Sequence, residues 1–146
     1  MNILFTSVGR RVELLRAFRA AYRDLGMAGR IIAVDADPLA PALREADVPY
    51  VVPRLADPSY VPMLAELCRQ QGITLIFPLI DEGMPRLAAG RRELEQTGAR
   101  LVLVPDKAVE TTRDKLLTHQ LFSRIGVPTP ATWLHADGYS NAITYP

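Results

Sequence analysis

Charged and polar side chains gather at three places where a short apolar run ends and a turn begins. The three stretches are Ser7-Val8-Gly9-Arg10-Arg11, Asp35-Ala36-Asp37 and Asp81-Glu82-Gly83. Arginine side chains and backbone N–H groups bind carboxylates and phosphates, whereas carboxylates bind amines and hydroxyl groups. These stretches are therefore candidates for holding a small substrate that carries charged or polar groups.

The two arginines stand just before a segment with helical periodicity, where the helix macrodipole would favour a carboxylate instead. One of Arg10 and Arg11 could point to solvent while the other pairs with Asp35, Asp37 or Glu13. Alternatively, one of them could hold an anionic ligand group at the start of the helix, together with backbone N–H groups. The residues alone leave both interpretations open.

The opening loop does not match the dinucleotide-binding pattern G-x-G-x-x-G, because it contains only Gly9. Asp35 ends the second apolar run, where dinucleotide-binding folds place a ribose ligand. An acidic residue there without the glycines is weak support for NAD binding. Asp81 and Glu82 are the best candidates for gripping a substrate amine or hydroxyl, although Glu82 could also cap the helix that follows.

A parallel sheet would bring these residues together, and the sequence predicts one. Apolar runs expected as buried strands alternate with segments of helical periodicity. The expected strands are 2–6, 30–37, 48–53, 73–80 and 99–105, and the expected helices between them are 12–25, 58–71 and 84–97. The predicted fold class is α/β, a Rossmann-like open parallel sheet of about five strands with helices on both faces. Such sheets bind ligands beyond the carboxyl ends of their strands.

Length and composition exclude several functional classes. The 146 residues suffice for a domain with a hydrophobic core, and 49% of them are apolar. With 17 basic and 16 acidic residues, we expect no nucleic-acid partner. No run reaches the roughly 20 apolar residues of a membrane span, so we expect no membrane partner.

Cys68 cannot form an internal disulfide, which favours the cytoplasm. His119 and His135 lack partners at metal-ligand spacing, so no metal site is expected.

The pattern changes after Pro105, where no further buried strand of the same kind follows. We expect a short helix and then a longer one over 113–125, with Leu117, Leu121 and Ile125 on its inner face. An edge strand is expected at 131–135, and Tyr145-Pro146 stands at the start of another β-like run.

The segment RDKLLTHQLFSRIGVPTPATW resembles the entry to the ATP-grasp fold. In that superfamily an Asp-Lys pair opens a helix, here Asp114-Lys115, and a Gly-apolar-Pro-x-Pro turn leads into the next subdomain. The α/β unit before it resembles the N-terminal domain that precedes ATP-grasp modules, as in biotin carboxylase and the large subunit of carbamoyl-phosphate synthetase. FTSVGRRVELLRAF is similar to the start of carbamoyl-phosphate-synthetase-like ATP-grasp proteins. The resemblance covers the whole chain.

The resemblance implies a pre-ATP-grasp Rossmann-like domain at 1–105 and the truncated start of the ATP-grasp module at 106–146. It implies an N-terminal fragment of an ATP-dependent carboxylate-amine ligase, which activates a carboxylate as an acyl phosphate. ATP and Mg²⁺ would bind in the full-length protein with the missing C-terminal subdomains, and no tightly bound cofactor is expected here. The fragment would contribute the substrate side of the cleft and be inactive alone.

Particular residues take roles from the same resemblance. Lys115 would approach the nucleotide phosphates, although Asp114 as a helix cap and Lys115 as a solvated surface residue would also fit. The loop after the first strand would face a small-molecule substrate rather than the nucleotide. The expected substrate-binding residues are Ser7, Gly9, Arg10, Arg11, Asp35, Asp81 and Glu82. No catalytic residue is expected in the fragment, and a homodimer stays open.

Two other functions fit the chain less well. A free-standing Rossmann-like nucleotide- or small-molecule-binding module would bind nucleotide by itself, but it leaves 106–146 unexplained. A receiver-type signalling domain would need paired acids after the first strand, where this chain has Thr6-Ser7.

Overall fold

The computed structural model describes residues 1–133, so the expectations for 134–146 lie outside the described residues. They include part of the expected edge strand, of which 131–133 have no regular structure, and Tyr145-Pro146. Contacts divide the chain into two compact units, Met1–Val104 and Pro105–Pro146.

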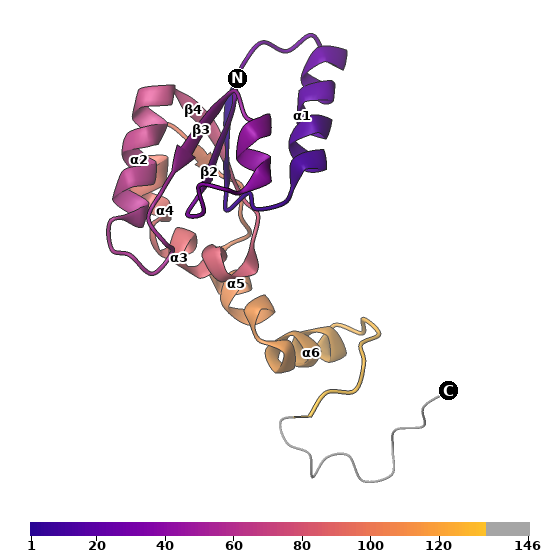
Figure 1. Cartoon of the computed structure of the whole chain (residues 1–146). Helices are drawn as coiled ribbons and strands as arrows, with labels where there is room; N and C mark the ends of the chain where they lie inside the picture. Colours follow the sequence, from indigo (N-terminus) through magenta and orange to yellow (C-terminus); the bar gives the residue numbers. More distant parts are fainter. Residues whose placement is uncertain (134–146) are drawn as a thin grey trace. The chain divides into compact units, whose positions relative to one another are not determined.

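The first unit is built on five parallel strands in the order β3-β2-β1-β4-β5 (Figure 1). The strands are β1 (Asn2–Thr6), β2 (Ile31–Asp35), β3 (Val48–Val51), β4 (Ile73–Pro78) and β5 (Arg100–Leu101). This arrangement confirms the predicted Rossmann-like α/β class. The chain adds strands outward from β1 to β3 and then crosses back to β4. The carboxyl ends of β1 and β4 therefore flank the switch point of the sheet.

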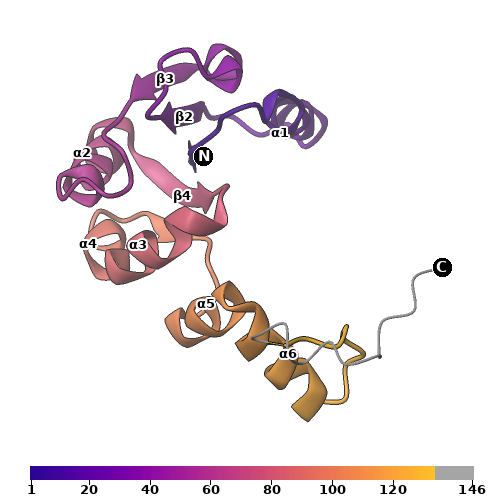
Figure 2. The ribbon, with the colours of Figure 1, turned by 60° about the horizontal axis from the view of Figure 1, so that its bottom comes forward.

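Helices cover both faces of this sheet, as Figure 2 shows. One face carries helix α1 (Val12–Asp24) and the 3₁₀ turn η1 (Pro41–Glu45). The other carries α2 (Tyr60–Gln71), α3 (Met84–Ala89) and α4 (Arg91–Glu95), and the 3₁₀ turn η2 (Asp81–Gly83) precedes α3. Side chains alternate across each strand, so Ile3 and Phe5 pack toward α1 while Leu4 packs toward α2. All three side chains are fully buried.

Where we expected one helix over 84–97, the structure has two, α3 and α4, joined at Gly90. Gly90 is also a point of close approach to α2. A Cβ atom at Gly90 would lie 2.6 Å from Cγ1 of Val61, closer than packed side chains allow. Because glycine lacks that atom, the backbone can pass Val61 at this point.

The last strand of the sheet is also shorter than the expected 99–105, since only two residues of β5 pair with β4. The guanidinium group of Arg91 lies along the outer edge beyond them. It donates to the carbonyl oxygens of Leu101, Leu103 and Val104 at 3.5, 3.4 and 2.8 Å. The Val102 N–H donates to a β4 carbonyl 2.9 Å away, so the Leu101 carbonyl on the same trans peptide faces away from β4.

The described part of the second unit contains α5 (Asp106–Arg113) and α6 (Lys115–Arg124). Asp114 caps α6, because its Oδ1 accepts the N–H groups of Leu116 and Leu117 at 2.8 and 3.0 Å. We expected one face of this helix to be buried. That expectation is wrong within residues 1–133, because no residue of α6 is buried. Two short helices enclose too little volume to bury an apolar stripe.

Candidate functional site

A pocket of about 450 Å³ lies at the carboxyl ends of four neighbouring strands. Its lining residues are Ser7, Gly9 and Arg11 after β1, Asp35 and Ala36 at the end of β2, Arg54, Leu55 and Ala56 after β3, and Ile80 after β4. Open parallel sheets bind their ligands at this edge. The pocket is therefore the candidate site.

The loop after β1 has an unusual backbone. Ser7 has a φ of 55° and is the only non-glycine residue with a positive φ among those described. Gly9 has a φ of 49°. Left-handed residues of this kind cluster at ligand-binding turns. The turn leads into α1 with Arg11 as the N-cap residue, and a Cβ atom on Gly9 would lie 3.9 Å from Nη1 of Arg11. The Arg11 guanidinium therefore lies close to this glycine.

The carboxylate of Asp35 holds this loop in place. Its Oδ2 accepts the Gly9 N–H at 2.8 Å, and its Oδ1 accepts the Asp37 N–H at 2.9 Å. A further bond of 3.3 Å runs from the Val8 N–H to the Val34 carbonyl. Both oxygens of Asp35 thus have a backbone donor before any ligand binds. This structural role explains why an acidic residue stands at the end of β2, and no ribose ligand is needed to explain it.

Two guanidinium groups give the pocket positive charge. The Arg11 and Arg54 side chains are exposed, and neither takes part in an ion pair within the described part of the chain. By contrast, Arg19 on α1 pairs with Asp47 at 2.7 Å. An arginine without a carboxylate partner at a ligand-binding edge is available to an anion.

A buried hydroxyl group lies beneath the loop. Tyr60, the first residue of α2, is only 2% exposed. Burial raises the pKa of Tyr60 above its ordinary value, and the side chains of Thr6 and Ser7 oppose that shift only in part. Within residues 1–133 its hydroxyl makes no hydrogen bond of ordinary geometry. Thr6, Ser7 and Tyr60 thus place three hydroxyl groups near one another at the end of β1.

The structure gathers some of the expected substrate-binding residues and separates others. Ser7, Gly9, Arg11 and Asp35 line the pocket. The remaining three, Arg10, Asp81 and Glu82, are exposed and are not among its lining residues. Glu82 does not cap α3, whose N-cap residue is Gly83 without a side-chain cap.

Lys115, the expected nucleotide-binding residue, is not among the residues that line the pocket. It is the first residue of α6 in the second unit, and its side chain is exposed. The Asp114 cap fixes the start of the helix that carries it.

Arg54 is the charged residue of the pocket that sequence reasoning missed. The expected third strand ended at residue 53 and the next expected helix began at residue 58, so residues 54–56 were given no role. Its position directly after a strand of the same parallel sheet was the signal available, because strand ends share one edge.

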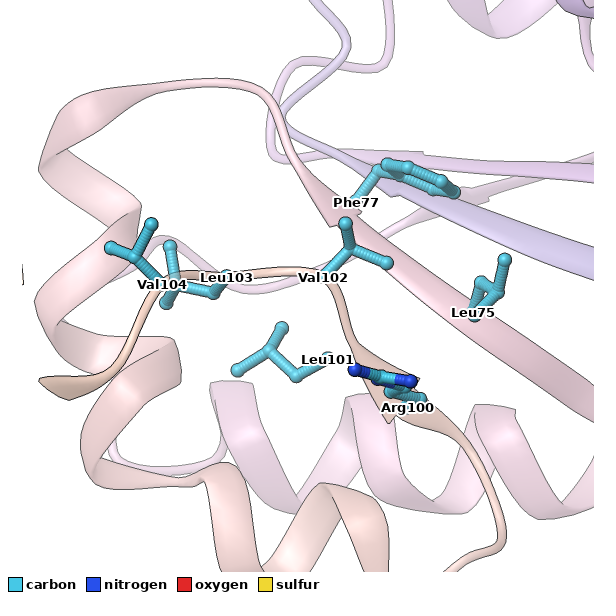
Figure 3. Close-up of a pocket in the computed structure, with 7 residues that line it drawn as sticks. All are labelled: Leu75, Phe77, Arg100, Leu101, Val102, Leu103 and Val104. Carbon is cyan, nitrogen blue, oxygen red and sulfur yellow. The ribbon is translucent and has the colours of Figure 1, made fainter.

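A second cavity, of about 580 Å³, lies along β4 and residues 100–104. Figure 3 shows Leu75, Phe77 and Val102 among the side chains that line it. Apart from Arg100, every lining side chain is apolar. Substrate sites need several converging polar groups, which this apolar cavity lacks. The pocket at the strand ends therefore remains the candidate site, although it is the smaller of the two.

Residues 1–133 lack two features that would point to other functions. No group of three or more His, Cys, Asp or Glu side chains is placed to hold a metal ion. No helix there has the length and apolar character required to cross a membrane.

Solved structures share this fold. Glycinamide-RNase-transformylase T from Mycobacterium tuberculosis matches with a TM-score of 0.65 and 22% identity, over 91% of this chain and 38% of that chain. L-amino acid ligase from Bacillus licheniformis matches with a TM-score of 0.65 and 18% identity, over 99% and 35% of the two chains. The biotin carboxylase subunit of pyruvate carboxylase matches at 0.58 and 19%, over 87% and 28%. This chain therefore spans well under half of each of these chains.

No curated protein matches this sequence significantly. A family model does match, over residues 3–102, and it is described as the PylC-like N-terminal domain. The match covers the whole five-stranded sheet except its first residue, Asn2. Together with the shared fold, it confirms the resemblance to the N-terminal region of ATP-grasp enzymes. The chain belongs to the family of PylC-like N-terminal domains.

Proposed function

We propose that this chain is the N-terminal, substrate-side domain of an ATP-dependent carboxylate-amine ligase of the carbamoyl-phosphate-synthetase-like ATP-grasp type. The observation that carries the proposal is the pocket at the strand ends, where the unpaired Arg11 stands at the start of α1 without the glycines of a dinucleotide site. Such a site suits a small anionic substrate better than a pyrophosphate.

In the complete enzyme, ATP transfers its γ-phosphoryl group to a carboxylate, an amine attacks the acyl phosphate, and phosphate leaves. Catalysis of this kind relies on positioning and on neutralising charge. The residues of this chain would contribute on the substrate side. The guanidinium of Arg11 binds an anionic group of the non-nucleotide substrate, Ser7 offers its hydroxyl group, and Asp35 holds their loop.

The nucleotide side would belong to the ATP-grasp module, which begins at about residue 106. Lys115 would reach the nucleotide phosphates there. Residues 1–133 contain no group of carboxylates suited to Mg²⁺, and we assign the metal to the later subdomains. Those subdomains would also cover the exposed apolar residues of α6. The single buried thiol of Cys68 favours a reducing compartment, and we place the enzyme in the cytoplasm.

A crossed kinetic experiment on the full-length enzyme tests the two sides. Arg11→Ala should raise the KM for the non-nucleotide substrate roughly ten- to a hundredfold, the effect of losing a charge-assisted hydrogen bond, and leave the KM for ATP within about twofold. Lys115→Ala should do the reverse. Arg23, exposed near the far end of α1, offers a matched control in Arg23→Ala. If Arg11→Ala weakens ATP instead, the two sides of the cleft are reversed.

A second experiment separates this proposal from a free-standing nucleotide-binding module. The 146-residue chain should show no ATP turnover and no tight nucleotide binding in a calorimetric titration with Mg-ATP. Low-micromolar binding by the chain alone would favour the free-standing module and overturn the assignment of the nucleotide to later subdomains.

A further inference from the structure

We propose that Arg11 and Arg54 form a two-guanidinium clamp for the anionic group of the substrate, a carboxylate or a phosphate monoester. The inference rests on the proposed function and extends it by adding Arg54 and a substrate class. The two arginines come from different strand ends, after β1 and after β3, and line the same pocket. Paired guanidinium groups present planar N–H forks that suit carboxylate and phosphate oxygens.

The backbone that carries Arg54 is firmly held. The Asp57 N–H donates to the Arg54 carbonyl at 2.9 Å and closes a turn. The Leu55 side chain packs on Gly83, where Cδ2 would lie 3.4 Å from an added Cβ atom. From α3, Arg86 donates to the carbonyl oxygens of Asp57 and Pro58 at 3.3 and 3.2 Å. A fixed backbone beneath a free guanidinium lowers the ordering entropy that binding must overcome.

The surroundings favour an anion over a cation. Asp35 is the one acidic residue among the nine that line the pocket, and both its oxygens already accept backbone N–H groups. Within the described residues it forms no ion pair with either guanidinium. Four lining residues are apolar, namely Ala36, Leu55, Ala56 and Ile80. The substrate class that fits is a small organic anion with a short aliphatic stem.

Nuclear magnetic resonance of the 146-residue chain at low salt tests the clamp, with inorganic phosphate and acetate as separate probes. The Nε–Hε resonances of Arg11 and Arg54 should shift together and saturate with one dissociation constant for at least one probe. Arg54→Ala and Arg11→Ala should each weaken that binding roughly three- to tenfold. A single exposed guanidinium binds an anion weakly, but the two guanidinium groups of the clamp bind the same anion together. Arg54→Lys should restore only part of it, since lysine lacks the planar fork. Arg23→Ala, which removes the same charge, should leave the constant unchanged. Saturable binding of phosphate but not acetate would identify the anionic group of the substrate as a phosphate monoester. Saturable binding of acetate but not phosphate would identify it as a carboxylate.

Two results would overturn the clamp: no saturable shift with either anion, or binding that Arg54→Ala leaves unchanged. If Arg11→Ala alone weakens the probe, the clamp fails while the proposed substrate side stands. If Mg-ATP binds the isolated chain tightly and that binding depends on both arginines, the clamp stands and the proposed division of the cleft fails. The kinetic experiment above does not involve Arg54, so the two proposals can fail separately.

Discussion

Replacing Asp35 should damage the fold as well as the pocket, because its carboxylate accepts two backbone N–H groups at 2.8 and 2.9 Å. A hydrogen bond to a charged acceptor contributes about 1.5–3 kcal/mol, and partial exposure reduces that value. We therefore expect Asp35→Ala to lower the free energy of unfolding by about 2–4 kcal/mol. Asp35→Asn should lower it by about 1–3 kcal/mol, because the amide keeps one acceptor and turns a donor toward the other N–H.

Urea unfolding followed by circular dichroism measures this effect. With a slope of about 2 kcal/mol per molar urea, the midpoint of Asp35→Ala should fall by roughly 1–2 M at an unchanged slope. Asp37→Ala is the matched control. Its carboxylate accepts a single exposed bond, from the Leu39 N–H at 2.9 Å, so the loss should stay below about 1 kcal/mol. Equal unfolding free energies for the Asp35→Ala and Asp37→Ala variants, within about 0.5 kcal/mol, would refute the role given to Asp35.

Three further predictions concern the core and the pH dependence of stability. Burial would raise the pKa of Asp47, but a backbone N–H and the Arg19 guanidinium together lower it below its ordinary value of 3.8. The stability that this carboxylate contributes is fully present above a pH of that value and is lost as the pH falls below it. Asp47→Asn should therefore flatten the acid limb of a plot of unfolding free energy against pH. Parallel curves for the two proteins would contradict this. Gly90→Ala should lower the melting temperature through an overlap with Val61 worth about 1–3 kcal/mol, whereas an unchanged melting temperature would show that α2 moves aside freely. Burial raises the pKa of the Cys68 thiol to about 11, so iodoacetamide at pH 7.5 should modify it only after unfolding, and rapid labelling of the native chain would place it outside the core.

The sequence was sufficient to predict the sheet and the edge at which the candidate residues meet. Apolar runs separated by helical segments allow few topologies, since parallel strands need crossovers of one hand. For that reason Ser7, Gly9, Arg11 and Asp35 could be expected at one edge, and the structure brings them into one pocket.

The details of the site depend on interactions that the sequence does not display. Which of the two arginines lines the pocket follows from the left-handed backbone at Ser7 and Gly9, a conformation that no pattern predicts for a serine. Arg54 is brought near by contacts of Leu55 with Gly83, far along the chain. The close approach of Gly90 to Val61, which belongs to another helix, is likewise not visible in the sequence.

The position of Arg91 has a consequence for self-association. A sheet edge with open carbonyl groups is a template on which another chain can add a strand, and long, flat, exposed edges are common starting points for aggregation. Here one guanidinium group already takes up the carbonyl oxygens of Leu101, Leu103 and Val104. A strand approaching β5 would first have to displace that side chain. Glu95, also on α4, accepts the Leu101 N–H at 3.2 Å, so among the described residues the β5 edge is protected by side chains of α4.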